Sequence, residues 1–338
     1  MEYRYIGRSG LRVSPICLGT MTFGSQCDEK NAFKIMDKAY DSGVNFFDTA
    51  ELYPVPPEAK LAGLTEEMVG RWLKTKPRDS IILASKVAGA ASGWFVPPIR
   101  HGYTACDRFH IERAIEGSLK RLGTDYIDLY QMHWPDTIVP IEETMRAFDS
   151  LVQSGKVRYI GTSNDTARGT MKSLMVSKYE KLARFESVQN NFSLLNRRDL
   201  TEIGALCREE KISLLPYSPL AGGILSGKYN QSTVGQGRFS DYVNSTNQRQ
   251  RLMAARFLND KTLASTQEYL RIAHEAGLNP VTMAIAWSKQ FDFVASTIIG
   301  ATTAEQLEPS LAAMDLTLST EILQKLDAVH AKILYPMG

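Results

Sequence analysis

Three apolar segments of the sequence each end in a titratable side chain. Residues 45–48 end in Asp48, residues 81–86 in Lys86, and residues 127–133 in His133. Tyr53 follows Asp48 by five residues, in a proline-rich loop. Side chains of these types can move a proton to or from a substrate oxygen. Because parallel barrel strands bring their carboxyl ends to one rim, the sequence predicts that these groups meet there.

The elements that would position these groups alternate between apolar strands and amphipathic helices. A β-hairpin is expected at residues 3–13, and helices with an apolar stripe are expected between the strands and at 304–314 and 319–330. The expected strands are 16–19, 45–48, 81–86, 127–133, 157–163, 187–190, 212–217 and 297–300. This pattern predicts an α/β fold, a (β/α)8 TIM barrel with an N-terminal hairpin and two extra helices, as one domain over residues 1–338.

Two stretches are expected to be long loops at the rim. Residues 87–99 are uncharged and carry Trp94 and Phe95, and loops of this length are often functional. After the strand at 212–217, several glycines and the polar stretch 230–250 predict a second long loop. Its glycines would let the backbone approach a bound phosphate closely.

Composition excludes several classes of function. The net charge of +2, from 39 basic and 37 acidic residues, offers no basic surface for nucleic acid. No apolar run is long enough to cross a membrane, and the polar N-terminus is unlike a signal peptide, so a cytoplasmic location is expected. Four unpaired cysteines predict reduced thiols and no metal site. The absence of a GxGxxG motif after a strand argues against a Rossmann nucleotide site.

Asp48, Tyr53, Lys86 and His133 resemble the catalytic tetrad of the aldo-keto reductase family. Residues 43–50 and 122–133 resemble the two signatures of that family, and 161–164, 217–220 and 299–306 resemble its cofactor-contacting segments. The resemblance extends from the hairpin to about residue 326 and is closest to the bacterial Tas-like branch.

The resemblance implies an oxidoreductase that reduces aldehydes or ketones to alcohols, reversibly, with NADPH. Tyr53 would be the general acid and base, Lys86 would lower its pKa, and Asp48 would hold Lys86 in place. His133 would orient the substrate oxygen. The implied cofactor-binding residues are Gly19, Thr20, Met21, Asp48, Ser163, Asn164, Gln189, Tyr217, Ser218, Pro219, Leu220, Gly222, Lys228, Arg238, Gly300, Thr302 and Gln306. The expected substrate wall comprises Phe23, Trp94, Phe95, His133 and Trp134.

The sequence departs from the family pattern near the expected adenosine end of the cofactor. Gly300 and Thr302 stand where a Lys or Arg often meets the 2′-phosphate. Arg238 could reach that phosphate from the loop after the seventh strand, or it could be a solvated charge. We therefore expect a modest preference for NADPH, with NADH as an alternative.

Two other functions remain open from the sequence. A nicotinamide-binding regulator similar to potassium-channel β subunits would turn over slowly. A barrel isomerase or aldolase would instead use Lys86 to form a Schiff base. The complete tetrad favours the reductase, with a small carbonyl compound or alcohol as its partner. The physiological substrate, the preferred direction and the oligomeric state stay open.

Overall fold

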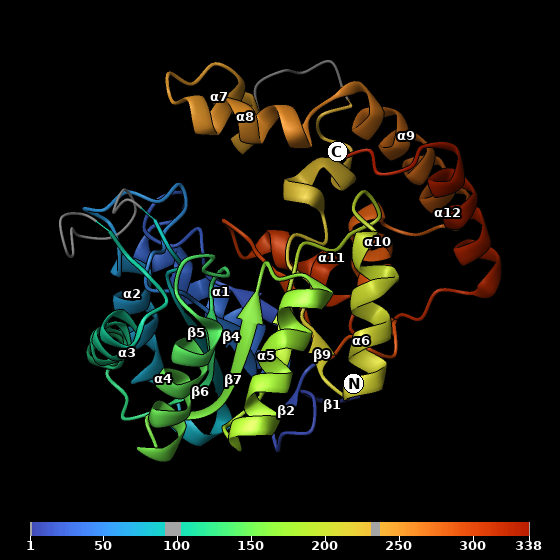
Figure 1. The fold of residues 1–338 in the computed structure, drawn as a ribbon. Helices are drawn as coiled ribbons and strands as arrows, with labels where there is room; N and C mark the ends of the chain where they lie inside the picture. Colours follow the sequence, from blue (N-terminus) through green and yellow to red (C-terminus); the bar gives the residue numbers. More distant parts are fainter. Residues whose placement is uncertain (1, 92–102, 231–236, 338) are drawn as a thin grey trace.

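The computed structural model describes residues 2–91, 103–230 and 237–337 (Figure 1). Eight parallel strands form one sheet in the order β10-β3-β4-β5-β6-β7-β8-β9. They are β3 (Ile16–Gly19), β4 (Phe46–Asp48), β5 (Ile82–Val87), β6 (Ile127–Met132), β7 (Val157–Ser163), β8 (Phe185–Gln189), β9 (Ser213–Leu214) and β10 (Thr297–Ile299). Each lies in a segment expected to be a strand, with its ends shifted by a few residues.

The two edge strands of this sheet, β9 and β10, meet and close it into a barrel. Leu214 forms a parallel bridge with Val294, and Tyr217 forms another with Ile298. The Ile298 N–H donates to the Pro216 carbonyl over 2.7 Å. The predicted (β/α)8 barrel is therefore confirmed.

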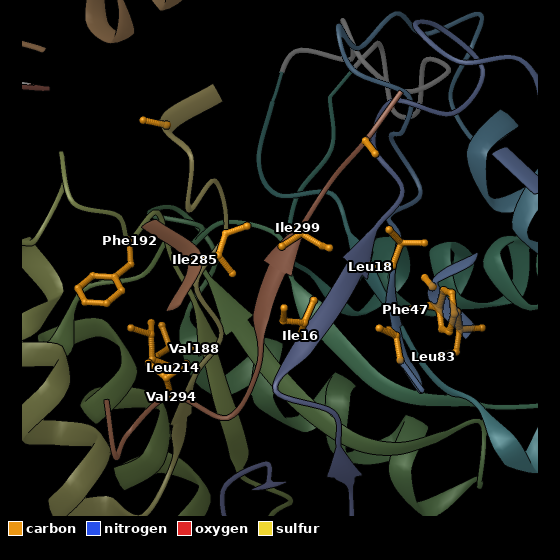
Figure 2. Packing of buried hydrophobic residues seen from close by; sticks show 14 of the residues in the cluster. Ile16, Leu18, Phe47, Leu83, Val188, Phe192, Leu214, Ile285, Val294 and Ile299 are labelled. Atoms are coloured by element: carbon orange, nitrogen blue, oxygen red, sulfur yellow. The ribbon is translucent and has the colours of Figure 1, made fainter. Parts of the chain in front are cut away.

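Alternate residues of the strands face opposite sides, as strand geometry requires. Leu18, Phe47 and Leu83 are neighbours in register on adjacent strands and belong to the main hydrophobic cluster, which the helices cover (Figure 2). The helices between successive strands are α1 (Glu29–Asp41), α2 (Leu64–Leu73), α3 (Arg108–Leu122), α4 (Ile141–Gln153), α5 (Ala167–Glu180), α6 (Glu202–Glu210) and α10 (Pro280–Lys289). The intervening residues Phe46 and Ala84 belong to a second cluster, inside the barrel.

The N-terminal hairpin seals one end of the barrel. Strand β1 (Arg4–Tyr5) pairs antiparallel with β2 (Arg12–Val13), as expected. Ile6, Leu11 and Val13 are buried and pack in the same inner cluster as Phe46 and Ala84. The hairpin therefore covers the end of the barrel at which the strands begin.

One expectation about the loops was wrong. The stretch 230–250, expected to be a loop, contains α7 (Arg238–Val243) and the start of α8 (Gln248–Phe257). These helices form because Phe239 stacks on Phe257, with ring centroids 4.8 Å apart, and both side chains are buried. In Figure 1, α7 and α8 lie at the top of the view, beyond the carboxyl ends of the strands.

The chain then continues through α9 (Asp260–Glu275) to α10, β10 and the final helices. The two extra helices are α11 (Glu308–Leu311), preceded by the short 3₁₀ helix η5 (Glu305–Leu307), and α12 (Thr320–Lys332). No helix in the described residues is long and apolar enough to cross a membrane.

Candidate active site

Asp48 and Lys86 form a buried ion pair at the carboxyl end of the barrel. Asp48 ends β4 and is 2% exposed, whereas Lys86 lies near the end of β5 and is 0% exposed. The Lys86 ammonium donates to Asp48 Oδ1 and, over 2.9 Å, to the Thr49 carbonyl. Removing either charge would leave the other buried without its counter-ion, which is strongly destabilising.

Tyr53 completes this cluster because the chain turns back after β4. The Tyr53 N–H donates to the Ala50 carbonyl over 3.1 Å, which closes the turn. The turn places the Tyr53 hydroxyl 3.3 Å from Lys86 Nζ, which donates to it. Lys86 thus contacts two other residues of the expected tetrad, Asp48 and Tyr53.

Glu51, in the same turn, fastens the Tyr53 segment to β5. The Glu51 N–H donates to the Lys86 carbonyl over 3.2 Å, and its Oε1 accepts from the Ala88 N–H over 2.9 Å. His110 Nε2 lies 3.2 Å from the same oxygen, at ion-pair distance but without hydrogen-bond alignment. Glu51 was not among the predicted site residues, although it lies between Asp48 and Tyr53 in the sequence.

His133 follows β6 and lies beside Tyr53. Its N–H donates to the Val87 carbonyl over 3.0 Å, which extends the pairing of β6 with β5 by one residue. The His133 and Tyr53 rings are 5.7 Å apart and nearly perpendicular. His133 is buried, and its Nδ1 has no hydrogen-bond partner within the described ranges. One polar atom of His133 is therefore buried without a hydrogen bond from the described residues.

Burial sets the protonation states of these groups. It holds the pKa of His133 well below its usual range, and the charge of Lys86 acts in the same direction. Burial also acts to lower the pKa of Lys86, but Asp48 and then Tyr53 outweigh it, so that pKa is raised. At neutral pH the imidazole is uncharged and the amine is charged.

The pKa of Tyr53 differs from the expectation based on the sequence. Burial raises the Tyr53 pKa above its ordinary value, while the charge of Lys86 opposes this rise without overcoming it. Lys86 thus acts on the Tyr53 pKa in the predicted direction, but burial outweighs it. The cause is desolvation, which disfavours a phenolate and which the sequence does not reveal. Tyr53 holds its proton at neutral pH.

Two glutamine amides surround the second oxygen of Asp48. Gln189 Nε2 donates to Asp48 Oδ2 over 2.9 Å, and Gln131 Nε2 donates to it over 3.1 Å. Gln189 was among the expected cofactor residues, but Gln131 was missed. Its position in the sequence could have indicated it. Gln131 lies on β6, two residues before His133, so both side chains face the same side.

Several other expected cofactor residues converge beside His133. Asn164 Nδ2 donates to the His133 carbonyl over 2.9 Å, and Asn164 Oδ1 accepts from the Tyr217 hydroxyl over 2.7 Å. The Ser163 hydroxyl donates to the Gln189 carbonyl over 2.7 Å. Tyr217 is partly exposed, so one aromatic ring is fixed in orientation and still accessible. Ser163, Asn164, Gln189 and Tyr217 therefore form one hydrogen-bonded group.

The remaining expected cofactor residues lie on neighbouring segments of the same rim. Thr20 donates to the Asp48 carbonyl through its N–H, and a Cβ atom at Gly19 would lie only 2.8 Å from Ile298 Cγ2. Thr302 N–H donates to Gln306 Oε1 over 2.9 Å. Met21 packs near Tyr53, Gly300 follows β10, and Ser218, Pro219 and Leu220 lead into the 3₁₀ helix η4 (Ala221–Ser226), which contains Gly222.

The two cations proposed for the cofactor lie farther along the chain. Lys228 is exposed, with Nζ 5.1 Å from the Tyr229 ring centroid. Arg238 is the first residue of α7, and its side chain lies outside what the structure describes. The structure therefore shows only that the backbone of Arg238 begins a helix.

Of the expected substrate wall, His133 and Trp134 lie at the site. Trp134 packs against the small apolar cluster of Ala50, Leu52, Tyr53 and Ala88, and its Nε1 donates to the Ala90 carbonyl over 3.3 Å. Phe23 has no exposed surface and packs in the main hydrophobic cluster. Trp94 and Phe95 lie outside the described residues.

Comparison with known proteins agrees with this geometry. Residues 15–331 match the model of the Aldo/keto reductase family. The protein tas of Escherichia coli (strain K12) is 38% identical over 99% of both chains. The oxidoreductase YrpG of Bacillus subtilis (strain 168) is 37% identical over 97% of this chain and 96% of its own. A protein named as a voltage-gated potassium channel subunit beta, from Oryza sativa subsp. japonica, is 33% identical over 97% of this chain and 96% of its own. The chain therefore belongs to the aldo/keto reductase family and is an oxidoreductase.

Proposed function

We propose that this protein is an NADPH-dependent reductase of aldehydes and ketones in which Tyr53 donates the proton. The observation that carries this proposal is the 3.3 Å contact between the Tyr53 hydroxyl and the buried Lys86 ammonium. A protonated phenol beside a fixed positive charge suits the protonation of an oxyanion as it forms. In the reverse direction the Tyr53 phenolate would accept the proton of the alcohol.

The chemistry of the rim residues fits a nicotinamide. The Gln189 and Asn164 amides and the partly exposed Tyr217 ring offer hydrogen bonds and a stacking surface next to His133. A reduced nicotinamide would supply the hydride, and the residues of the chain would supply position and electrostatics. Gly19 lets β3 pack closely against β10, because a Cβ there would clash with Ile298.

The residues of the chain would divide the work in the following way. Asp48 holds Lys86 charged, and Lys86 stabilises the phenolate that Tyr53 becomes after giving up its proton. Uncharged His133 can donate one N–H to the carbonyl oxygen of a substrate, which orients it and stabilises developing charge. Burial of these groups strengthens their electrostatic interactions.

The NADPH preference would depend on Arg238, assisted by Thr302. A guanidinium forms forked, charge-assisted hydrogen bonds that match a phosphate. Arg238 begins α7, and the glycine-containing η4 segment connects that region to Tyr217. Thr302, held by Gln306, contributes only neutral donors. NADH is the alternative if Arg238 does not reach the 2′-phosphate.

The substrate would be an aromatic or bulky carbonyl compound. Trp134 and Met21 pack against the apolar cluster that surrounds Tyr53, so the surroundings of the proton donor are mainly apolar. We include Trp94 and Phe95 in this wall on the basis of the sequence alone.

A cofactor-binding regulator is the second candidate, favoured by the 33% identity to the potassium channel subunit named above. The complete cluster of Asp48, Tyr53, Lys86 and His133 supports turnover instead.

The test separates the candidates in two steps. Titration with NADPH, followed by nicotinamide fluorescence, measures binding, and NADPH absorbance then follows turnover with benzaldehyde and with propanal. We expect binding, and faster turnover with the aromatic aldehyde. Binding without turnover of any carbonyl compound in a wider screen would favour the regulator. Absence of nicotinamide binding would favour Schiff-base chemistry at Lys86.

A further inference from the structure

We propose that Gln131 is a positioning residue that fixes the orientation of the Gln189 amide. In this orientation Gln189 presents only its carbonyl oxygen to a bound ligand, which suits the NH₂ group of the nicotinamide carboxamide. This inference rests on the proposed function, because it concerns how the nicotinamide is recognised. It adds to the tetrad a residue that contacts neither substrate nor cofactor.

The geometry forms a closed triangle of hydrogen bonds. Gln131 Nε2 donates to Asp48 Oδ2 over 3.1 Å, and Gln189 Nε2 donates to the same oxygen over 2.9 Å. Gln189 Nε2 also donates to Gln131 Oε1 over 3.1 Å. Gln131 is 0% exposed and Gln189 is 3% exposed. The three side chains come from β6, β8 and β4, so the triangle spans the interior of the barrel.

The Asp48 carboxylate determines which way both amides face. An ionised carboxylate only accepts hydrogen bonds, so each amide that meets it must present its nitrogen. Asp48 Oδ1 is engaged by Lys86, which leaves Oδ2 for the two amides. A flipped Gln189 would place its oxygen against both Asp48 Oδ2 and Gln131 Oε1. Two repulsive contacts therefore exclude that flip, and Gln131 supplies one of them.

The consequence is that Gln189 has no N–H left for a ligand. A side-chain amide carries two N–H donors, and here one goes to Asp48 and the other to Gln131. Within the described ranges no group donates to Gln189 Oε1, so this oxygen is the remaining hydrogen-bonding group of the side chain. A nicotinamide carboxamide can donate to it, whereas a methyl ketone at the same ring position cannot.

Removal of the Gln131 amide is expected to weaken the discrimination between a carboxamide and a methyl ketone on the ligand ring. In Gln131→Leu, the second N–H of Gln189 would be buried without a partner, which is costly. A single hydrogen bond, to Asp48, then holds the amide, which can pivot about that bond so that its freed N–H reaches a ligand carbonyl oxygen. Both a carboxamide and an acetyl group offer such an oxygen, so discrimination between them should disappear.

The experiment compares the dissociation constants of NADP⁺ and its 3-acetylpyridine analogue, measured by isothermal titration calorimetry without substrate. One neutral hydrogen bond corresponds to about 2- to 12-fold in affinity, so wild type should prefer NADP⁺ by about that factor. Gln131→Leu should bring the ratio to within about twofold of one. The matched control is Gln290→Leu, because Gln290 accepts a hydrogen bond from the Leu318 N–H far from the site. The control should keep the wild-type ratio.

Several outcomes would overturn the inference. Equal affinities in wild type would show that Gln189 does not present its oxygen, while leaving the proposed reductase intact. An unchanged ratio in Gln131→Leu would show that Gln131 does not set the orientation. If Gln131→Leu fails to fold, Gln131→Met makes the same comparison with a more flexible side chain. Binding of neither dinucleotide to wild type would remove the proposed function and this inference together.

Discussion

The two ends of the barrel are built from the same strands but differ in the polarity of their inward-facing side chains. This polarity changes within two residues. On three adjacent strands the inward-facing residue changes from apolar to polar, from Phe46 to Asp48, from Ala84 to Lys86, and from Leu129 to Gln131. The apolar layer packs on the hairpin and excludes water. The polar layer buries a charge pair whose remaining hydrogen bonds are made to Gln131, Gln189, Tyr53 and the Thr49 carbonyl. One layer therefore contributes stability, and the layer above it is arranged for chemistry.

The largest expected effect lies in the polar layer. Tyr53→Phe removes the proposed proton donor and should lower turnover by about 10²–10⁴-fold, the usual contribution of acid catalysis. The affinity for NADPH and the melting temperature should change little. Steady-state rates and fluorescence titration check this, with Tyr126→Phe, whose hydroxyl contacts Asp79 away from the site, as the control. Turnover within about threefold of wild type in Tyr53→Phe would move the acid elsewhere, with His133 the first alternative.

The apolar layer should respond in the opposite manner. Ile6→Ala leaves a cavity where the hairpin seals the barrel, and such substitutions cost about 2–5 kcal/mol of stability. The rate per folded molecule should stay at the wild-type value, since no polar group moves. Urea unfolding and a rate at low temperature measure the two quantities separately. A slower folded enzyme of unchanged stability would mean that the two layers are not separable.

The next effect is expected in α7, outside the strands of the barrel. Arg238→Ala should weaken NADPH binding by about 10- to 150-fold, the equivalent of one charge-assisted hydrogen bond of about 1.5–3 kcal/mol. NADH binding should be unaffected, because NADH lacks the 2′-phosphate. The dissociation constants of NADPH and NADH, measured for wild type and for Arg238→Ala, test this prediction. If the mutant keeps the wild-type ratio of the two constants, Arg238 does not read the phosphate, and equal affinities in wild type would indicate dual use.

A smaller effect is expected at Glu51, which connects the Tyr53 turn to β5. Glu51→Ala removes the acceptor for the Ala88 N–H and should lower kcat about 10-fold, or roughly 1.4 kcal/mol in the barrier. Glu51→Gln keeps an oxygen at that position and should retain most of the activity. Comparison of kcat for the two variants, with NADPH affinity as a second readout, tests whether the hydrogen bond from the Ala88 N–H to Glu51 supports turnover. Equal losses in both variants would point to the charge, and hence to His110, rather than to the hydrogen bond.

The smallest expected effect is an absence of titration near neutral pH. Tyr53 keeps its proton because its pKa is raised, and His133 stays uncharged because its pKa is lowered. The reductive kcat/KM should therefore be flat through neutral pH and fall only as the pH rises through the Tyr53 pKa, above its ordinary value of about 10. A pH–rate profile at saturating NADPH measures this. An inflection near pH 6.5, the ordinary value for histidine, would show that His133 titrates.

The sequence pattern could locate a residue at the rim where an apolar run led directly into a titratable side chain. Asp48, Lys86 and His133 could be located in this way, because strand ends in a barrel share a rim. Glu51 and Gln131 were missed for different reasons. Glu51 lies in a turn, where its partner, the Ala88 N–H, is defined only by the fold. Gln131 is a neutral residue within a strand, and neutral residues carry little signal without their contacts.

The outer elements and the energetics were harder to predict. The start of α8, from Gln248 to Arg251, is polar and suggests a loop, and its buried contact between Phe257 and Phe239 joins residues in two separate helices. The sign of the Tyr53 shift depends on how far burial outweighs one nearby charge. Burial of that degree is a property of the complete barrel and not of any local segment.

The junction between β9 and β10 has an evolutionary consequence. The barrel closes there through isolated bridges, and the chain between these two strands leaves the rim to form η4, α7, α8, α9 and α10 before it returns. Insertions or deletions in that excursion need not alter the register of β4, β5 and β6, which carry Asp48, Lys86 and Gln131. Tyr217 belongs to the junction itself, so a lengthened excursion starts beside the proposed nicotinamide surface. Evolution can thus change which molecules bind at the rim while the proton-transfer groups stay unchanged.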